Sequence, residues 1–213
     1  MSRSRLIWGV ALLSMLAALG CSDDSNPTSP PRFSVRADSS FVVGASGDLE
    51  ISDFAGNINV ITGAANAVDI VAVKWARDES HLDLIDLEML ALTNGVRVTT
   101  ANPSNFSNAW VDIDATIPPD MRPRIEAGAA EIKYTGPAPG ETFFAVGAGN
   151  ITITLPPGAN VEVVLSVGAG TIRVDFPVVG QVDAHLVSGV IGTGADGKIV
   201  AQAGAGNIVI ASQ

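Results

Sequence analysis

The sequence predicts an all-β protein, and three observations support that prediction. From Phe33 onwards, short segments that alternate apolar and polar residues recur between Gly, Asn and Pro, a pattern typical of strands and turns. Apolar residues make up 47% of the chain and charged residues only 16%, so the chain has ample apolar surface to bury. A motif of small residues and glycine followed by an aliphatic residue also recurs at nearly constant spacing, which indicates a repeat architecture.

The first 20 residues are predicted to be a lipoprotein signal peptide. Arg3 and Arg5 precede an uncharged run of 14 residues (6–19), which as a helix spans roughly 21 Å, less than the ~30 Å hydrocarbon core of a membrane. A basic start, an apolar middle and a small-residue exit are typical of a secretory signal. The exit ends in Gly20 and Cys21, the only cysteine, and resembles the lipobox of bacterial lipoproteins. That resemblance implies cleavage before Cys21 and a lipid on its thiol.

The segment after the cleavage site has the composition of a linker. Residues 21–32 are small, polar and proline-rich, which predicts a flexible tether between the lipidated Cys21 and a folded domain over residues 33–213. The mature chain has no cysteine free for a disulfide, so its fold depends on burial alone. The formal net charge of −10 argues against nucleic-acid binding, which needs a cluster of cations.

Four local elements are clear enough to place. Strict alternation predicts a strand over 111–117, which ends at two prolines. The segment 161–167 is apolar on both faces, which predicts a strand in the interior of a sheet. Asn94-Gly95 predicts a two-residue hairpin turn between two short apolar runs. The one helical candidate is the segment 78–86, where apolar residues share a face.

The repeat is the strongest feature of the chain. Copies of the small-Gly-x-aliphatic motif begin at residues 44, 53, 127, 146, 167, 186 and 203. A unit of about 20 residues gives a path of roughly 65 Å, enough to wrap once around a narrow apolar core. Stacked turns would then place Ile151, Ile172, Ile191 and Ile208 in one inward column.

These spacings favour a single-stranded β-solenoid with glycine-rich corners, and the alternative is an antiparallel β-sandwich. The two early copies lie only nine residues apart, so the amino-terminal half need not be wound like the carboxy-terminal repeats.

Residues 33–213 resemble the bacterial putative adhesins related to the autotransporter-adhesin head (GIN-type) domain, a family of largely unassigned function. The matching stretches are residues 47–51, 56–60 and 112–119, followed by the later small-Gly-x-Ile repeats. The resemblance implies β-helical repeats on an exported, often membrane-anchored protein. Its motifs are structural corners, so it transfers no catalytic residue.

Groups of residues that could perform chemistry are scarce. His81 and His185 are the only histidines and have no spacing typical of a zinc site, and Ser188 lacks the Gly-x-Ser-x-Gly elbow. Asp112 and Asp114 lie on one strand face about 6.7 Å apart along the backbone, where a solvated outer face is favoured over a glycosidase pair. We therefore expect no catalytic residue, no metal and no cofactor.

The sequence favours a lipid-anchored, non-enzymatic, adhesin-like binding module of the cell envelope. Its expected partners are the membrane, through the lipid anchor, and an unknown protein or polysaccharide ligand. Ser22 follows the cysteine in place of an inner-membrane retention Asp, which by resemblance to diderm lipoproteins favours the outer membrane. The alternatives are an envelope structural or stress-signalling component that contacts another envelope protein, and a polysaccharide-degrading enzyme. The expected binding strip consists of Asn150, Thr152, Thr154, Thr171, Arg173 and Asn207.

Overall fold

The computed structural model describes residues 33–213, except positions 45, 64–65 and 105–107. The described residues are all-β, as the sequence predicts, apart from the short helix α1 (Glu79–Leu82). The strands are β1 (Phe33–Val42), β2 (Ser46–Thr62), β3 (Ala67–Ala76), β4 (Asp86–Leu92), β5 (Gly95–Ala101), β6 (Trp110–Ile117), β7 (Asp120–Thr135), β8 (Gly140–Leu155), β9 (Val161–Ala169), β10 (Ile172–Val174), β11 (Val178–Val182), β12 (Leu186–Ile191), β13 (Gly197–Ala205) and β14 (Ile208–Ser212). The predicted signal peptide, Cys21 and the predicted tether lie outside the described residues.

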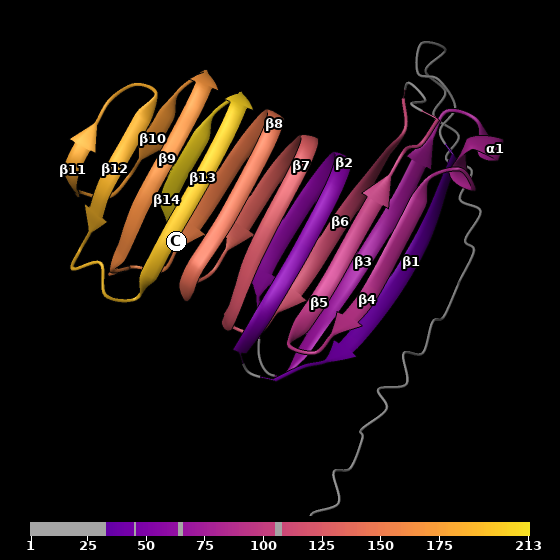
Figure 1. The fold of residues 1–213 in the computed structure, drawn as a ribbon, viewed down its shortest axis with the longest axis horizontal. Helices are drawn as coiled ribbons and strands as arrows, with labels where there is room; N and C mark the ends of the chain where they lie inside the picture. Colours follow the sequence, from indigo (N-terminus) through magenta and orange to yellow (C-terminus); the bar gives the residue numbers. More distant parts are fainter. Residues whose placement is uncertain (1–32, 45, 64–65, 105–107) are drawn as a thin grey trace, which may run out of the picture.

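The long strands β2, β7 and β8 each run through two layers of the fold (Figure 1). In the first layer their amino-terminal halves pair in parallel, and the layer continues in the order β4-β5-β2-β7-β8-β13-β9-β12-β11. In the second layer their carboxy-terminal halves pair, and the order is β1-β3-β6-β2-β7-β8-β14-β10. The result is a mixed sheet folded over on itself, parallel in its middle and open at both ends.

Antiparallel pairs are confined to the two ends of the stack. At one end β1, β3 and β6 pair antiparallel, as do β4 and β5, and at the other end β9, β12 and β11 do. The amino-terminal part is therefore wound differently from the parallel middle, a possibility that the close spacing of the early motif copies left open.

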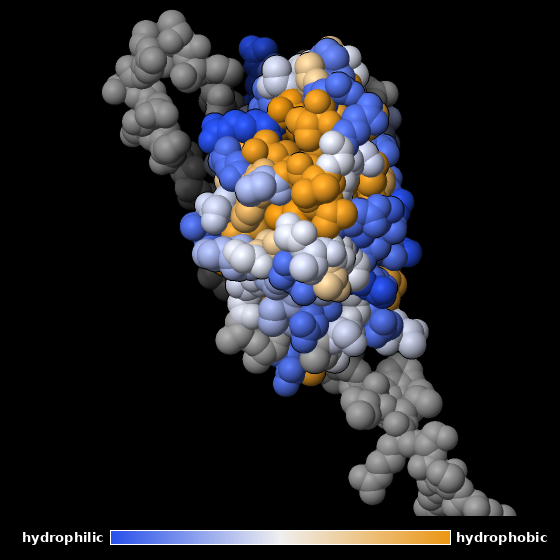
Figure 2. Space-filling model, turned by 90° about the vertical axis from the view of Figure 1, so that its left-hand side faces the viewer, coloured by the Kyte–Doolittle hydropathy of each residue, from blue (hydrophilic) through white to orange (hydrophobic). Residues whose placement is uncertain are grey.

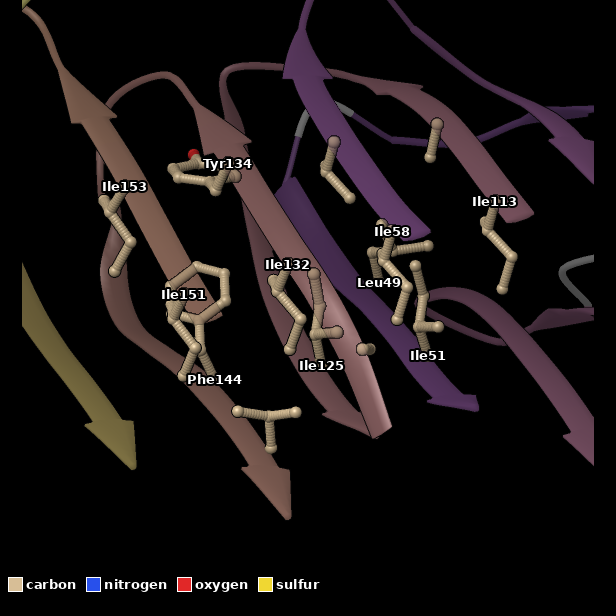
Figure 3. Packing of buried hydrophobic residues seen from close by; sticks show 14 of the residues in the cluster. Leu49, Ile51, Ile58, Ile113, Ile125, Ile132, Tyr134, Phe144, Ile151 and Ile153 are labelled. Atoms are coloured by element: carbon tan, nitrogen blue, oxygen red, sulfur yellow. The ribbon is translucent and has the colours of Figure 1, made fainter. Parts of the chain in front are cut away.

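The core is a set of in-register apolar columns between the layers (Figure 3). One column in the second layer consists of six isoleucines, Ile113, Ile58, Ile132, Ile151, Ile208 and Ile172. The first five are at most 1% exposed, and Ile172, on the last strand, is half-buried. Burying each aliphatic side chain stabilises the fold by about 1.5–3 kcal/mol.

The predicted column is confirmed for Ile151, Ile172 and Ile208, and it is wrong for Ile191. Ile191 lies on β12 in the first layer, where it pairs antiparallel with Val161 and Val178. The motif copy beginning at residue 186 therefore forms no corner of the parallel stack, because its strand returns in the opposite direction.

The neighbours in the stack also differ from the order in the sequence. β13 lies between β8 and β9, so the copy beginning at 203 pairs with those beginning at 146 and 167. Because all these corners have nearly the same composition, their sequences do not specify which copy lies next to which.

Two of the other local predictions are confirmed, and the helix predicted over 78–86 forms only over Glu79–Leu82. Residues 111–117 form β6 with Val111, Ile113, Ala115 and Ile117 buried, and residues 161–167 lie in β9 between two neighbouring strands. The hairpin is shifted by one residue, since Gly95 already pairs with Leu92. A Cβ on Gly95 would lie 2.0 Å from the carbonyl oxygen of Asp48, so this glycine is required for close packing against β2.

Glycine corners connect the two layers where the long strands bend. Gly149 and Gly206 have φ values of +133° and +143°, which L side chains rarely adopt. A Cβ on Gly206 would lie 1.6 Å from the carbonyl oxygen of Gly149. Neighbouring turns of the chain, which we call rungs, therefore stack closely at this corner only because no side chain separates them.

Candidate functional site

The structure places the expected binding strip on the outer face of the second layer. Each of the three paired isoleucines on β8, β14 and β10 is preceded by one strip residue. These strip residues are Asn150, Asn207 and Thr171. Thr152 pairs with Val209 on β14, which in turn pairs with Arg173 on β10. All six strip residues are half-buried or exposed, so they do share one accessible surface. Whether that surface binds a ligand stays a prediction.

Three strip residues form a hydrogen-bonded ladder along the stack. The backbone N and Nδ2 of Asn207 both donate to Oδ1 of Asn150 at 3.0 Å. The backbone N and Oγ1 of Thr171 donate to Oδ1 of Asn207 at 3.1 and 2.8 Å. Asn150 in turn donates from Nδ2 to Oε2 of Glu131 at 3.2 Å. These side chains hold neighbouring rungs together, which limits their capacity to bind anything else.

The aspartates considered as a catalytic pair belong to the same system. Asp112 accepts from the backbone N and Nδ2 of Asn57 at 2.9 and 2.8 Å, and Asp114 accepts from Nδ2 of Asn59 at 3.1 Å. Both carboxylates lie on the outer face of β6, which agrees with the predicted solvated face.

The outer face of the first layer carries most of the ion pairs. One row of outward residues alternates in charge across β2, β7, β8, β13 and β9, and consists of Asp48, Arg122, Glu141, Lys198 and Glu162. Arg122 pairs with Asp48 at 2.8 Å, and Lys198 pairs with Glu162 at 3.1 Å. We call this outer face, together with the arginines described next, the charged face.

A second row on the charged face combines arginine with an aromatic ring. Arg97 pairs with Glu50 at 2.7 Å, and Arg124 pairs with Glu126 at 2.6 Å. The guanidinium of Arg124 also lies 4.4 Å from the ring centre of Phe143 on β8, within range of a cation–π contact. Arginine and aromatic residues are enriched where proteins bind one another.

Sequence reasoning missed the charged face, although a signal was present. Residues 48–50 carry acids two apart, and residues 122–124 carry arginines two apart. Such spacing places each pair on one face of a strand, and the two segments become neighbours in register. Only the pairing of β2 with β7 shows that the acidic residues 48 and 50 lie opposite the arginines 122 and 124.

A shallow groove of about 540 Å³ follows the corner between the layers. Its floor is made of glycine and alanine from β7, β8 and β13, and the carboxylate of Asp53 lies at one end. Asp53 is only 5% exposed; its Oδ1 accepts a hydrogen bond from Oγ1 of Thr100, and its Oδ2 has no hydrogen-bond partner. Burial raises the pKa of Asp53 to about 7, against the lowering effect of the Thr100 hydroxyl.

The raised pKa makes the stability of the domain depend on pH. Folding favours the protonated carboxyl, because the pKa is about 7 in the folded chain and 3.8 without burial. The stabilisation is complete below pH 3.8 and is lost as the pH rises to about 7, with a decrease of up to about 4 kcal/mol. Asp53→Asn removes the titrating group, so the difference in unfolding free energy between variant and wild type should grow over this range. Urea unfolding between pH 4 and 8 measures it, and a difference that does not change with pH would contradict the assignment.

Two features of other site classes were not found among the described residues. None of the described His, Cys, Asp and Glu side chains gather in threes with a geometry that suits a metal ion. The described part of the chain also contains no helix of the length and apolar character that a membrane span requires.

Comparison with known proteins gives a fold relationship. No protein-family model and no curated protein matches the chain. Among solved structures, a putative cell adhesion protein from Clostridium sporogenes is similar with a TM-score of 0.55 and 12% identity, over 84% of this chain and 100% of that one. At that identity the likeness shows a shared fold.

A putative adhesin from Bacteroides fragilis is similar at 10% identity over 82% of this chain and 96% of that one, with a TM-score of 0.28. Another from Parabacteroides merdae is similar at 7% identity over 81% and 95%, with a TM-score of 0.24.

Proposed function

We propose that this chain is a lipid-anchored, non-enzymatic, adhesin-like binding module of the cell envelope, held in the outer membrane through Cys21. The lipobox-like exit around the only cysteine supports the anchor. The fold shared with a putative cell adhesion protein supports a role at the cell surface.

The architecture that we assign to this module is a β-solenoid. Its support is the parallel, in-register pairing of β2, β7 and β8 in both layers, with a glycine corner between the layers. Antiparallel pairs are found only at the two ends of the coil, whereas a sandwich would be built from them throughout.

The observation that carries the proposed function is the charged face. Arg97 and Arg122 are held by ion pairs to a neighbouring strand, and Arg124 is held by an ion pair to Glu126 on its own strand, so little conformational entropy is lost when a ligand contacts them. Phe143 adds an aromatic surface beside Arg124. An alternating array of charges on a flat sheet suits an extended protein or polysaccharide ligand of matching pattern, because repeated contacts can form along the rows.

The experiment compares the two outer faces of the same module. Charge reversal of Arg122 and Arg124 to Glu is expected to reduce attachment of protein-bearing cells to a ligand-coated surface at least tenfold, since each substitution replaces attraction with repulsion. Attachment of the wild type should also weaken as the salt concentration rises, because exposed charges are screened. Flow-cell counting of attached cells measures both effects.

Two control variants complete the design. Thr152→Glu with Arg173→Glu changes the predicted strip by a similar number of charges, and normal attachment of this variant would assign binding to the charged face. Cys21→Ala should release the module from the cells and abolish attachment. If both face variants attach normally while folded and surface-exposed, neither outer face is the binding surface. If wild-type cells attach no better than Cys21→Ala cells, the proposed function is wrong.

A further inference from the structure

The end of the stack formed by β10, β11 and β12 is open and apolar. Figure 2 shows this end, where hydrophobic residues gather in a patch with polar residues around it. Val179 and Val182 on β11 are 76% and 61% exposed, although valine is a residue that folding normally buries. The patch, which we call the apolar end, consists of Ile172, Val174, Phe176, Val178, Val179, Val182 and Leu186.

Both strands at this end leave one side of their backbone unpaired. β11 pairs only with β12, and β10 pairs only with β14. Proteins usually protect such edges with charged residues or with a covering segment. The segment 176–182 contains no charged residue, and the charges that flank it, Asp175 and Asp183, are bound by Arg173 and Gln181.

The opposite end of the stack is protected in the usual way. The edge strand β1 carries the ion pair Arg36–Asp38 at 2.9 Å, and α1 packs against β1 and β3. The edge strand β4 carries two acidic residues. This contrast between the ends indicates that the apolar end is a contact surface for another β strand.

We propose that a second copy of this chain docks at the apolar end, with β11 pairing antiparallel to β11 of the other copy about a two-fold axis at Gly180. In that register Val178 faces Val182, Val179 faces Gln181, and Gly180 faces Gly180 across the axis. The segment 178–182 is thus self-complementary, as an isologous contact requires. The axis stands normal to the first layer, so the second layers of the two copies lie on the same side.

Two observations select a second copy over other occupants. First, residues 1–32 of the same chain join β1, nine strand spacings or about 43 Å from β11. The predicted tether of residues 21–32 spans at most about 42 Å when fully extended, so it cannot both anchor and cover the apolar end. Secondly, the paired segment 178–182 contains no charged residue, and the register places Asp183 opposite Pro177, so two chains of net charge −10 bring no like charges face to face there.

The size of the contact sets the expected affinity. Beyond β8 the first layer continues through four strands and the second through two, so β11 lies two strands beyond β10 and the copies meet along the first layer alone. A contact along the five residues of β11 buries less than about 1,000 Å² in total. An area of that size is typical of weak, transient contacts, so the dimer should form only at the upper end of the micromolar range of concentration.

The arrangement deepens the proposed function, on which this step rests. Pairing at β11 places the two β1 strands, and with them the two anchored segments, at opposite extremes of a rod about 90 Å long. Two copies paired in this way therefore suit anchors on two facing membranes, which is a homophilic contact between cells.

Sedimentation velocity of the full chain in detergent, from about 1 to 100 µM, tests the dimer. The expected result is a concentration-dependent dimer in the wild type and at least tenfold weaker association in Val179→Asp. The matched control is Val42→Asp on β1, an even more exposed valine (92%) at the opposite end, which should dimerise normally. A monomeric wild type over the whole range, or a dimer unaffected by Val179→Asp, overturns the proposal.

Cross-linking tests the register independently of charge. With Cys21→Ser as background, a mixture of the single variants Val179→Cys and Gln181→Cys should form a disulfide-linked dimer, because paired strands bring their Cα atoms within about 5.5 Å. Failure of the mixture to cross-link under oxidising conditions overturns the register. A dimer in solution without attachment of cells would refute the proposed function alone, and attachment by a monomer would refute this inference alone.

Discussion

Replacing Ile132 with Asp is expected to remove most of the stability of the domain. Ile132 is fully buried in the isoleucine column, with Ile58 on one side and Ile151 on the other. A carboxylate there would have no hydrogen-bond partner, and burying it should cost roughly 4 kcal/mol or more. Since domains of this kind are stable by only about 5–15 kcal/mol, thermal unfolding followed by circular dichroism should show a large fall in Tm.

The same substitution at the end of the column is the natural comparison. Ile172 is half-buried on the last strand, so Ile172→Asp keeps its charge partly in water and should cost less. Lys133→Asp, on the outer face one residue from Ile132, controls for charge alone and should change Tm little. Equal losses of Tm for Ile132→Asp and Lys133→Asp would mean that the column is not the core.

Gly206→Ala is expected to be nearly as damaging, although it adds a single methyl group. The new Cβ would lie 1.6 Å from the carbonyl oxygen of Gly149, and φ is +143°. The rungs would have to separate or the corner change conformation, with a cost of about 3 kcal/mol or more from overpacking and backbone strain. Urea unfolding measures the free energy directly.

A second glycine separates the effect of the contact from that of the backbone angle. Gly158 also has a positive φ, +78°, but a Cβ on it would meet no atom within 4 Å. Gly158→Ala should therefore cost only about 1 kcal/mol, the strain of the left-handed conformation. If the two alanine variants lose the same stability, close packing of the corner backbones does not contribute to it.

The local features of this fold were predictable because each depends on a few neighbouring residues. Alternation along 111–117 follows from the two-residue period of a strand, and it placed Val111 and Ile113 in the core correctly. The repeated corners likewise predicted that Ile151, Ile208 and Ile172 would align.

The non-local features were not predictable from the same signals. Ile191 has the spacing of the repeat, yet its strand β12 pairs antiparallel with β9. The reason is that β11 and β12 form a hairpin, which reverses the direction of the chain. The charged face arises only when residues 48–50 meet residues 122–124, more than seventy positions later. The expected strip was located correctly as a surface, but its asparagines proved to be ladder residues, a role that needs knowledge of the stacking order.

The insertion of β13 between β8 and β9 has a consequence for how the chain acquires its structure. Consecutive elements usually pair with one another, and pairs that are distant in sequence form slowly because their loops must close first. Here β8 and β9 cannot reach their final neighbours until residues 197–205 arrive, close to the carboxy-terminal end of the sequence. A chain interrupted before that point would expose two unpaired edges in the middle of its first layer. Until residues 197–205 pair with β8 and β9, the molecule retains unpaired strand edges of the kind that promote aggregation.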